Sequence, residues 1–310
     1  MTDDHIREVP MDWHATCDFL APCFPESVRA ELMLLEPGEL REIRIRADRP
    51  AVFITGTRRA ALQWKPGMQQ LEALVEALSG HSLYCREAEA ARGYLTLCGG
   101  HRLGFCGRVV QHGGKAQLAQ ISSVCLRIAA QWQGCADMLM PLLQGADGFG
   151  SLLVIGPPGS GKTTLLRDLA RQASTARQAW QTAVIDERGE LAACLNGVPQ
   201  MDVGSADVLE GLAKPEAIRW LLRSAAPEII ITDELADAED AAALADARCC
   251  GCAVCASCHG TSLTDAAARP AIAGLMAKRL FDRYAVLSPA GGGTVIALHD
   301  RTGAPLPLPS

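Results

Sequence analysis

The chain has 310 residues, 49% of them hydrophobic and 21% charged, and its formal net charge is −6. Such a composition supports a sizeable buried core and argues against an intrinsically disordered chain. The acidic balance, without any block rich in lysine and arginine, argues against a non-specific nucleic-acid binder.

No apolar run reaches the roughly 18 residues that a membrane-spanning helix needs. The opening segment, MTDDHIREVP, also lacks the basic and then apolar pattern of a signal peptide, so we expect a cytoplasmic protein. The thirteen cysteines are scattered and odd in number, which does not match a secreted disulfide framework. We expect free thiols, mostly buried as small hydrophobic side chains.

The first part of the chain mixes short helices and strands. Residues 25–35 carry a proline suited to a helix start, followed by apolar residues at helical spacing. Two strand-like runs in residues 93–110 meet at Gly99-Gly100, a pattern typical of a hairpin. These elements predict a smaller α+β N-terminal domain, residues 1–145, followed by the linker GADGFG. The other expected elements are strands in 42–46, 51–55 and 120–128 and two helices within 68–92.

From residue 146 to residue 310 the pattern changes to alternating strands and helices. Such alternation predicts an α/β domain, a parallel sheet with helices on both faces. The expected strands are 151–155, 182–186, 228–232, 252–257 and 294–299, and the expected helices start at Thr163 or cover 215–225 and 237–248.

The strongest motif is GPPGSGKT, residues 156–163, which fits the P-loop pattern G-x-x-x-x-G-K-[ST] in full. An apolar strand precedes it and a helical pattern follows it, which favours a genuine site over a chance glycine-rich turn. Backbone N–H groups would point at phosphate oxygens, Lys162 would reach the β- and γ-phosphates, and the Thr163 hydroxyl would bind Mg²⁺. We therefore predict a RecA-like P-loop NTPase domain with ATP and Mg²⁺ as cofactors. The expected nucleotide-binding residues are Gly156, Pro157, Pro158, Gly159, Ser160, Gly161, Lys162, Thr163 and Thr164.

Hydrolysis of ATP requires one carboxylate for the Mg²⁺ shell and another that orients the attacking water. The segment EIIITDE, residues 228–234, supplies both at the end of a strand: Asp233 for Mg²⁺ and Glu234 as catalytic base. The alternative is that this acidic pair only caps the following helix.

A second acidic loop, VIDERGEL, also lies where a strand is expected to end, and it contains Asp186, Glu187, Arg188 and Glu190. Ligands bind at this edge of such sheets. The loop therefore either positions water or Mg²⁺, or it is a solvated loop whose charges pair locally.

The segment CCGCAVCASCHG, residues 249–260, resembles part of a ferredoxin-type cluster motif in its cysteine spacing. Its centre lies where the sheet needs a buried strand, and residues three apart on a strand point to opposite faces. We therefore expect neither an iron–sulfur cluster nor zinc.

The order of these motifs, from the P-loop through DERGE and LLRSAAPEIIITDE to a strand ending in His-Gly, resembles the secretion-ATPase superfamily. Within it the chain is most similar to the stage III sporulation protein AA family, which also shares EIRIR, GYLTLCGGHRLGFCGRVV and SSVCLRIA. The resemblance covers roughly residues 25–290. It implies an aspartate box at Asp186, Glu187 and Glu190, and a Walker B region with Arg223 and Pro227-Glu228 before its strand.

The resemblance also assigns roles at the ends of the strands. It makes Glu234 the essential glutamate and places His259, the histidine box, beside the γ-phosphate. Asp233 stands where the superfamily usually has glycine, which leaves the Mg²⁺ contact open. The catalytic residues expected are Glu234, Asp233, His259, Glu187 and Arg223.

Members of the superfamily form hexameric rings with ATP between subunits, and the resemblance implies the same homo-oligomer here. Arginines that reach the nucleotide would come from a set of five: Arg102, Arg108, Arg127, Arg219 and Arg223. Each has a plain alternative, a surface ion pair worth less than about 1 kcal/mol.

The resemblance implies an ATPase motor that energises a channel between the mother cell and the forespore. It would be cytoplasmic, peripheral at the membrane of the mother cell, and in contact with membrane channel proteins. The alternative is a P-loop ATPase that binds single-stranded nucleic acid, which would need a basic groove bearing aromatic residues. The acidic balance and few aromatics disfavour it, so no nucleic-acid partner is expected. A scaffold that binds nucleotide without hydrolysis is disfavoured by Glu234 and His259.

Overall fold

The structure, a computed structural model, describes residues 7–9, 13–56, 58–80, 86–91, 93–112, 115–146, 148–177 and 179–309. It forms two compact units, one of Glu8–Gln131 and the other of Arg7 together with the chain from Trp132 onward. This division falls earlier than the predicted boundary after residue 145. Residues of the short helix α5 (Met140–Leu143) account for the difference, because Met140 and Leu143 join the core of the second unit.

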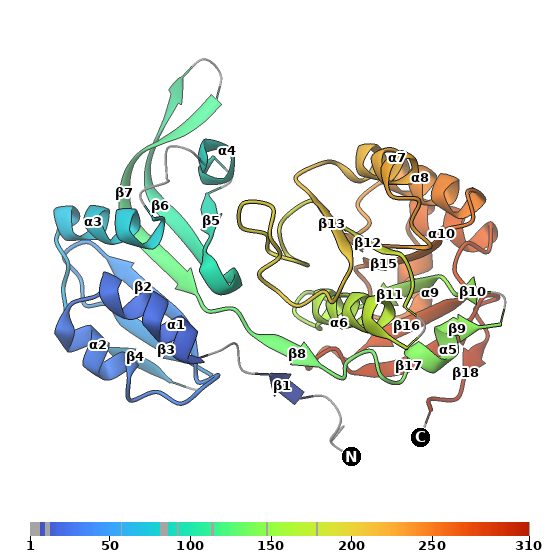
Figure 1. Cartoon of the computed structure of the whole chain (residues 1–310), viewed down its shortest axis with the longest axis horizontal. Coiled ribbons are helices and arrows are strands. Elements are labelled where there is room, and N and C mark those ends of the chain that lie inside the picture. Colours follow the sequence, from blue (N-terminus) through green and yellow to red (C-terminus); the bar gives the residue numbers. More distant parts are fainter. Residues whose placement is uncertain are drawn as a thin grey trace. The chain divides into compact units, whose positions relative to one another are not determined.

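The first unit is built on a six-stranded antiparallel sheet (Figure 1). The strand predicted at residues 42–46 is confirmed, and Ile43 and Ile45 are fully buried on one face of it. The hairpin predicted at Gly99-Gly100 is also confirmed, since strands pair antiparallel on either side of it. In order across the sheet, the strands are β4 (Arg59–Ala61), β3 (Val52–Thr55), β2 (Leu40–Arg46), β7 (Lys115–Arg127), β6 (Arg102–His112) and β5 (Tyr94–Thr96).

Helices of the first unit pack on this sheet through one apolar side. The helix expected in residues 25–35 is α2 (Glu26–Leu32), which buries Val28 and Leu32 as the spacing predicts. The first of the two helices expected within residues 68–92 is α3 (Met68–Leu78). The remaining helices are α1 (Trp13–Leu20), α4 (Glu87–Ala90) and the 3₁₀ helices η1 (Ala21–Cys23) and η3 (Cys98–Gly100). A separate two-stranded sheet pairs β1 (Arg7–Val9) with β8 (Gln131–Gln133).

The second unit contains the predicted parallel sheet, extended by two antiparallel strands at one edge. Its order is β13 (Asp207–Glu210), β12 (Thr182–Asp186), β14 (Ile229–Glu234), β15 (Ala253–Cys258), β11 (Leu152–Ile155), β16 (Arg283–Leu287), β17 (Val295–Asp300) and β18 (Pro305–Leu306). The strands β13 and β16 were not expected. β13 is an exposed edge strand with an acidic residue at each end, so its sequence carries little hydrophobic pattern.

Helices cover both faces of this sheet, as predicted (Figure 1). Alternate residues of β11 separate the two cores: Leu152 and Val154 pack with one helix, and Leu153 and Ile155 pack with the helices of the other face. The first face carries α6 (Lys162–Thr175), and the second carries α7 (Lys214–Ser224), α8 (Ala238–Cys249), α9 (Leu263–Ala267) and α10 (Pro270–Ala277).

The predicted linker GADGFG contains a small hairpin of β9 (Gln144–Gly145) and β10 (Gly148–Phe149). Phe149 is buried there, and its ring meets the ring of Trp180 edge to face at 5.7 Å. Through Phe149 this segment packs into the core of the second unit.

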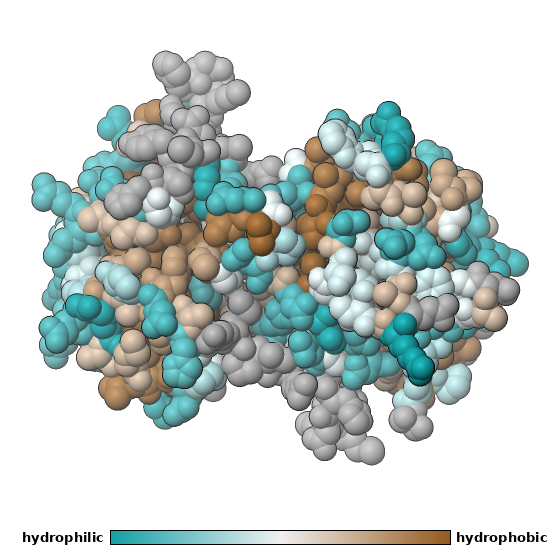
Figure 2. All heavy atoms as spheres, viewed as in Figure 1, coloured by the Kyte–Doolittle hydropathy of each residue, from teal (hydrophilic) through white to brown (hydrophobic). Residues whose placement is uncertain are grey.

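The surface mixes hydrophilic and apolar residues on the face seen in Figure 2. Its exposed large apolar side chains include Trp220 on α7 and Val109 on β6, each 55% exposed. Within the described ranges, every helix is too short or too polar to cross a membrane.

Candidate functional site

The P-loop connects β11 to α6 at the carboxyl edge of the parallel sheet. Gly159 and Gly161 have φ angles of 78° and 95°, in the left-handed region that favours glycine. A Cβ atom on Gly161 would lie 2.3 Å from the backbone nitrogen of Gly293, and one on Gly156 would lie 2.3 Å from Oγ of Ser160. A side chain at Gly161 would require the backbone at Gly293 to move, and one at Gly156 would require the Ser160 hydroxyl to move.

Lys162 begins α6 and is only 8% exposed. Its ammonium donates to the carbonyl oxygens of Gly156 and Pro157, at 2.9 and 3.1 Å. Burial lowers the pKa of Lys162, and the carboxylate of Glu234 opposes that shift. The lysine side chain therefore contacts the backbone of the loop that the sequence predicts to bind phosphate.

The donors of this loop suit a nucleoside triphosphate with Mg²⁺. Oγ of Ser160 is buried and has no hydrogen-bond partner in the described part of the chain. The hydroxyl-bearing Thr163 and Thr164 lie half-buried in the first turn of α6, where the helix dipole favours anions. A glycine-shaped backbone, a helix N-terminus, an ammonium and hydroxyl groups together match the chemistry of phosphate binding.

Glu234 and His259 meet beside the P-loop. Nε2 of His259 lies 2.7 Å from Oε1 of Glu234, and Nδ1 of the same ring lies 3.4 Å from Nζ of Lys162. The sheet order β14, β15, β11 explains this meeting, because all three residues follow or end neighbouring parallel strands at the same edge. Arg269 donates to the backbone carbonyl of His259 and holds that residue from behind. The structure therefore brings together three of the residues that the sequence singled out.

Asp233 does not share the contacts of its neighbour Glu234. Successive residues of a strand face opposite ways, and Asp233 instead forms an ion pair with Lys214 at 2.9 Å. Burial raises the pKa of Asp233 to about 6, against the effect of Lys214 and with a further contribution from Asp186 and Glu190. The capping alternative for this acidic pair is not what the structure shows, since the side chain of Asp237 caps α8.

Lys214 is the residue of this region that the sequence analysis missed. Its side chain is 3% exposed, and its ammonium also lies 2.9 Å from Glu187 and 4.0 Å from Asp240. Burial alone would lower the pKa of Lys214, but these carboxylates outweigh it and the pKa is raised. One signal was available: a lysine that opens a helix opposes the helix dipole, so it is out of place unless acids surround it.

Asp186 is fully buried and serves the loop that follows it. Its two carboxylate oxygens accept the backbone N–H groups of residues 190–193, at 2.8 to 3.2 Å. The guanidinium of Arg167, on α6, donates to the carbonyl oxygens of Glu190 and Leu191 in the same loop. Asp186 is therefore a loop-forming residue, while Glu187 is the acid of this loop that reaches Lys214.

The five candidate arginines lie in two different settings. In the first unit, the guanidinium of Arg102 lies 3.4 Å from the ring centroid of Tyr94, and Arg127 pairs with Glu42 at 3.6 Å. Arg108 is exposed on β6. On α7 both remaining candidates are exposed, and Nε of Arg223 donates to the backbone carbonyl of Arg219. A role for any of the five across a subunit interface stays a prediction.

The cysteine-rich segment spans the end of α8 and the strand β15. Cys255 is fully buried between β11 and β14, opposite Leu152 and Ile231. Burial raises the pKa of its thiol to about 12 and that of Cys258 to about 11. These two cysteines act as small core residues of the strand that delivers His259 to the site.

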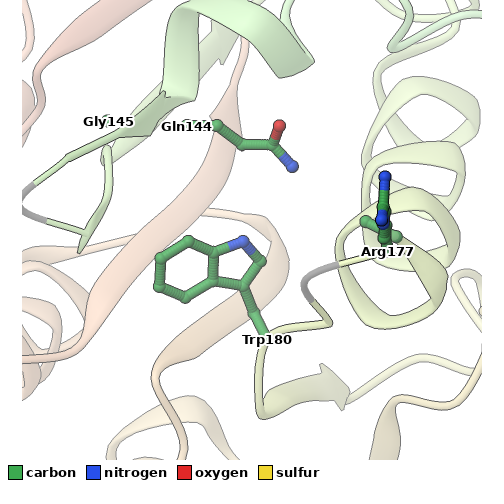
Figure 3. Close-up of a pocket in the computed structure, with 5 residues that line it drawn as sticks. Gln144, Gly145, Arg177 and Trp180 are labelled. Carbon is green, nitrogen blue, oxygen red and sulfur yellow. The ribbon is translucent and has the colours of Figure 1, made fainter.

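A separate pocket of about 590 Å³ lies at the other end of α6 (Figure 3). The length of α6 puts roughly 20 Å, at 1.5 Å per residue, between this pocket and the P-loop. It is therefore not part of the site around Lys162. Its lining residues are Gln144, Gly145, Ala176, Arg177 and Trp180.

The parallel sheet and the P-loop at its carboxyl edge define a P-loop NTPase fold, and solved structures agree. The ATPase DotB of Yersinia pseudotuberculosis has a TM-score of 0.56 at 14% identity, covering 90% of this chain and 80% of that chain. The pilus retraction motor PilT, solved with bound ADP, has a TM-score of 0.55 at 15% identity, with coverages of 80% and 74%. At such identities the likeness concerns the fold.

Sequence comparison defines the family. The family model described as "Sporulation stage III, protein AA" matches residues 27–306. Stage III sporulation protein AA of Bacillus subtilis (strain 168) is 40% identical over 293 residues, which cover 92% of this chain and 95% of that protein. The chain belongs to the stage III sporulation protein AA family, as the motif order predicted.

Proposed function

We propose that this chain is an ATP-hydrolysing motor subunit of a secretion-type apparatus. The observation that carries the proposal is the line of contacts from Lys162 through His259 to Glu234, at 3.4 and 2.7 Å. A lysine that can reach the phosphates and a carboxylate that can orient the attacking water are groups that phosphoryl transfer to water uses, and the histidine links the two here. Glu234 is partly exposed, with 31% of its side chain accessible, so water can reach its carboxylate.

In this proposal each residue has a defined task. The backbone of the P-loop and Lys162 bind the phosphates of ATP, and Thr163 and Asp233 hold Mg²⁺. When bound, Mg²⁺ neutralises negative charge on the phosphates. Glu234 orients the attacking water and accepts its proton, and His259 holds the Glu234 carboxylate beside the γ-phosphate.

The biological role is proposed from the family. A relative that is 40% identical over most of both chains is named for stage III of sporulation. PilT, which shares the fold, is described as a retraction motor. We propose that the chain forms a hexameric ring in the cytoplasm of the mother cell, docks on membrane channel proteins, and energises a channel to the forespore. Glu187 and Arg223 would contribute to the site in that ring.

The test is phosphate release by the purified full chain with ATP and Mg²⁺, together with mass measurement with and without ATP. The wild-type chain should hydrolyse ATP, and Lys162→Ala should abolish both nucleotide binding and hydrolysis, because it removes the ammonium that contacts the phosphates. Hydrolysis that persists in Lys162→Ala would refute the proposal. The rate should not depend on single-stranded DNA or RNA, and strong stimulation by either would favour the nucleic-acid-binding alternative.

A further inference from the structure

The ammonium of Lys214 joins acids from three separate parts of the second unit. Oε2 of Glu187 comes from the loop after β12 and Oδ1 of Asp233 from the end of β14, each 2.9 Å from Nζ. Oδ2 of Asp240, on α8, lies 4.0 Å from the same nitrogen. Glu187 is far from Asp233 in the sequence, whereas Asp233 and Asp240 belong to consecutive elements, so one lysine cross-links the loop after β12 to the β14–α8 segment.

Burial makes this arrangement more than a surface ion pair. The side chains of Lys214, Asp233 and Asp240 are 3%, 7% and 9% exposed. Removing charges from water is costly, and a buried ion pair adds little net stability compared with apolar packing. What such a cluster does supply is a fixed position for each charged group, because an unpaired acid there would be strongly disfavoured.

Hydrogen bonds also hold the backbone segments next to these acids. Oδ2 of Asp240 accepts the backbone N–H of Ala236 at 2.9 Å, which anchors the turn between β14 and α8. On the other side, the loop that holds Glu187 is pinned by Asp186 and by Arg167 from the P-loop helix. Through Glu187, Lys214 is therefore linked to the loop that the helix after the P-loop holds, and through Asp233 it is linked to the strand that ends at Glu234.

We propose that Lys214 is a positioning residue of the nucleotide site, whose ammonium holds the carboxylates of Glu187 and Asp233 together at the carboxyl edge of the sheet. This inference rests on the proposed function, because Asp233 is there a ligand of Mg²⁺. It adds a residue that acts through other groups and need not touch the nucleotide.

The test compares Lys214→Met with a matched control, Lys278→Met, which changes an exposed lysine at the end of α10. In the full chain without nucleotide, amide hydrogen exchange should accelerate in residues 187–193 and 233–240 of Lys214→Met. Exchange in α6 and in the first unit should stay as in the wild type, whereas a general loss of structure would accelerate them all.

The rate of ATP hydrolysis is a second test of the role of Lys214. Lys214→Met should lower kcat by about 10- to 100-fold, the usual effect of losing a residue that orients metal ligands. Affinity for ATP measured in EDTA should be unchanged, because the P-loop contacts remain. Lys278→Met should match the wild type in both measurements.

A double variant distinguishes the loss of the Lys214 charge from a general folding defect. Lys214→Met leaves Asp233 buried without its cation, so its melting temperature should fall; Lys214→Met/Asp233→Asn removes both charges and should recover much of that loss. If exchange, kcat and melting temperature of Lys214→Met all equal those of the control, the inference is wrong. A wild-type chain that binds ATP without releasing phosphate would refute the proposed function instead, and the exchange measurement would still decide the role of Lys214.

Discussion

Nε2 of His259 lies 2.7 Å from Oε1 of Glu234, and this contact fixes the state of the histidine ring. The other ring nitrogen, Nδ1, lies 3.4 Å from the ammonium of Lys162, which can only donate. Nδ1 must then accept, so the ring proton is on Nε2 and is donated to Glu234. With Nδ1 accepting and Nε2 donating, the ring satisfies both partners and aligns the carboxylate beside the P-loop.

Replacing Glu234 with glutamine should separate ATP binding from ATP hydrolysis. Gln keeps the size of the side chain and one oxygen that can accept from His259, but it cannot take a proton from water. We expect phosphate release to fall by about 100-fold or more, the scale of general-base catalysis. Binding of a fluorescent ATP analogue should be unchanged.

The matched control for that experiment is Glu239→Gln, an exposed glutamate in the first turn of α8. It makes the same chemical change away from the P-loop and should leave the rate of phosphate release as in the wild type. Turnover that survives in Glu234→Gln would show that another group acts as the base.

The site could be predicted from sequence where its residues form a contiguous motif or end a strand. GPPGSGKT is complete by itself, Glu234 was predicted as an acid at the end of a parallel strand, and His259 was predicted only from the resemblance to the family. Lys214 could not be predicted in this way, because its partners Glu187, Asp233 and Asp240 lie on three elements that only the folded sheet brings together. A lysine that opens a helix indicates that acids surround it, but the sequence pattern does not tell which acids these are.

Asp186 shows a related limit. Its place after a strand suggested either a catalytic role or a solvated loop, yet both of its oxygens are used by backbone N–H groups of its own loop. In the fold, most strands with alternating or apolar runs were predicted, but β16 was missed although four of its five residues are buried. The edge strand β13 was missed because its core-facing pattern is weak. The hydrogen bonds within a turn and the pairing of an edge strand depend on which residues are neighbours in the folded chain.

Asp186→Ala should therefore act on stability. It would leave the N–H groups of the buried residues Leu191, Ala192 and Ala193 without their acceptor. At about 1 to 3 kcal/mol for each unsatisfied buried group, the free energy of unfolding should fall by at least about 3 kcal/mol. Differential scanning calorimetry measures the loss.

An exposed aspartate of α8 provides the comparison: Asp246→Ala should change the free energy of unfolding by less than about 0.5 kcal/mol. If Asp186→Ala melts like the wild type and only loses ATP turnover, then its main role is in catalysis and the loop-forming role is wrong.

Two glycines of the P-loop provide a matched pair for backbone strain. Both Gly159 and Gly161 have positive φ, so alanine at either position should cost about 1 kcal/mol from the backbone alone. A Cβ on Gly159 meets no atom within 4 Å, whereas one on Gly161 would lie 2.3 Å from the backbone of Gly293. Gly161→Ala should therefore lower the free energy of unfolding by more than about 3 kcal/mol.

Calorimetric melting of the two variants checks this difference directly. Equal losses would mean that the turn containing Gly293 moves aside at little cost. A larger loss for Gly161→Ala would confirm that this turn supports the P-loop.

His101 makes the stability of the first unit depend on pH. The side chain is 1% exposed, its Nδ1 accepts the backbone N–H of Ala129 at 3.0 Å, and its ring stacks on Phe19. Burial lowers the pKa of His101 from 6.5 to about 4. The unfolded chain therefore binds a proton at a pH where the folded chain does not.

The difference between the two pKa values sets the direction in which stability changes with pH. The contribution of His101 is fully present above pH 6.5 and is lost as the pH falls toward 4, because only the unfolded state is protonated in that window. At 1.36 kcal/mol per pKa unit, the total loss should be about 3 kcal/mol. His101→Asn keeps an oxygen that can accept from Ala129 but cannot titrate, so its melting transition should depend less on pH. His14→Asn, on the exposed side of α1, should keep the wild-type slope, and equal slopes in all three proteins would show that His101 does not control acid stability.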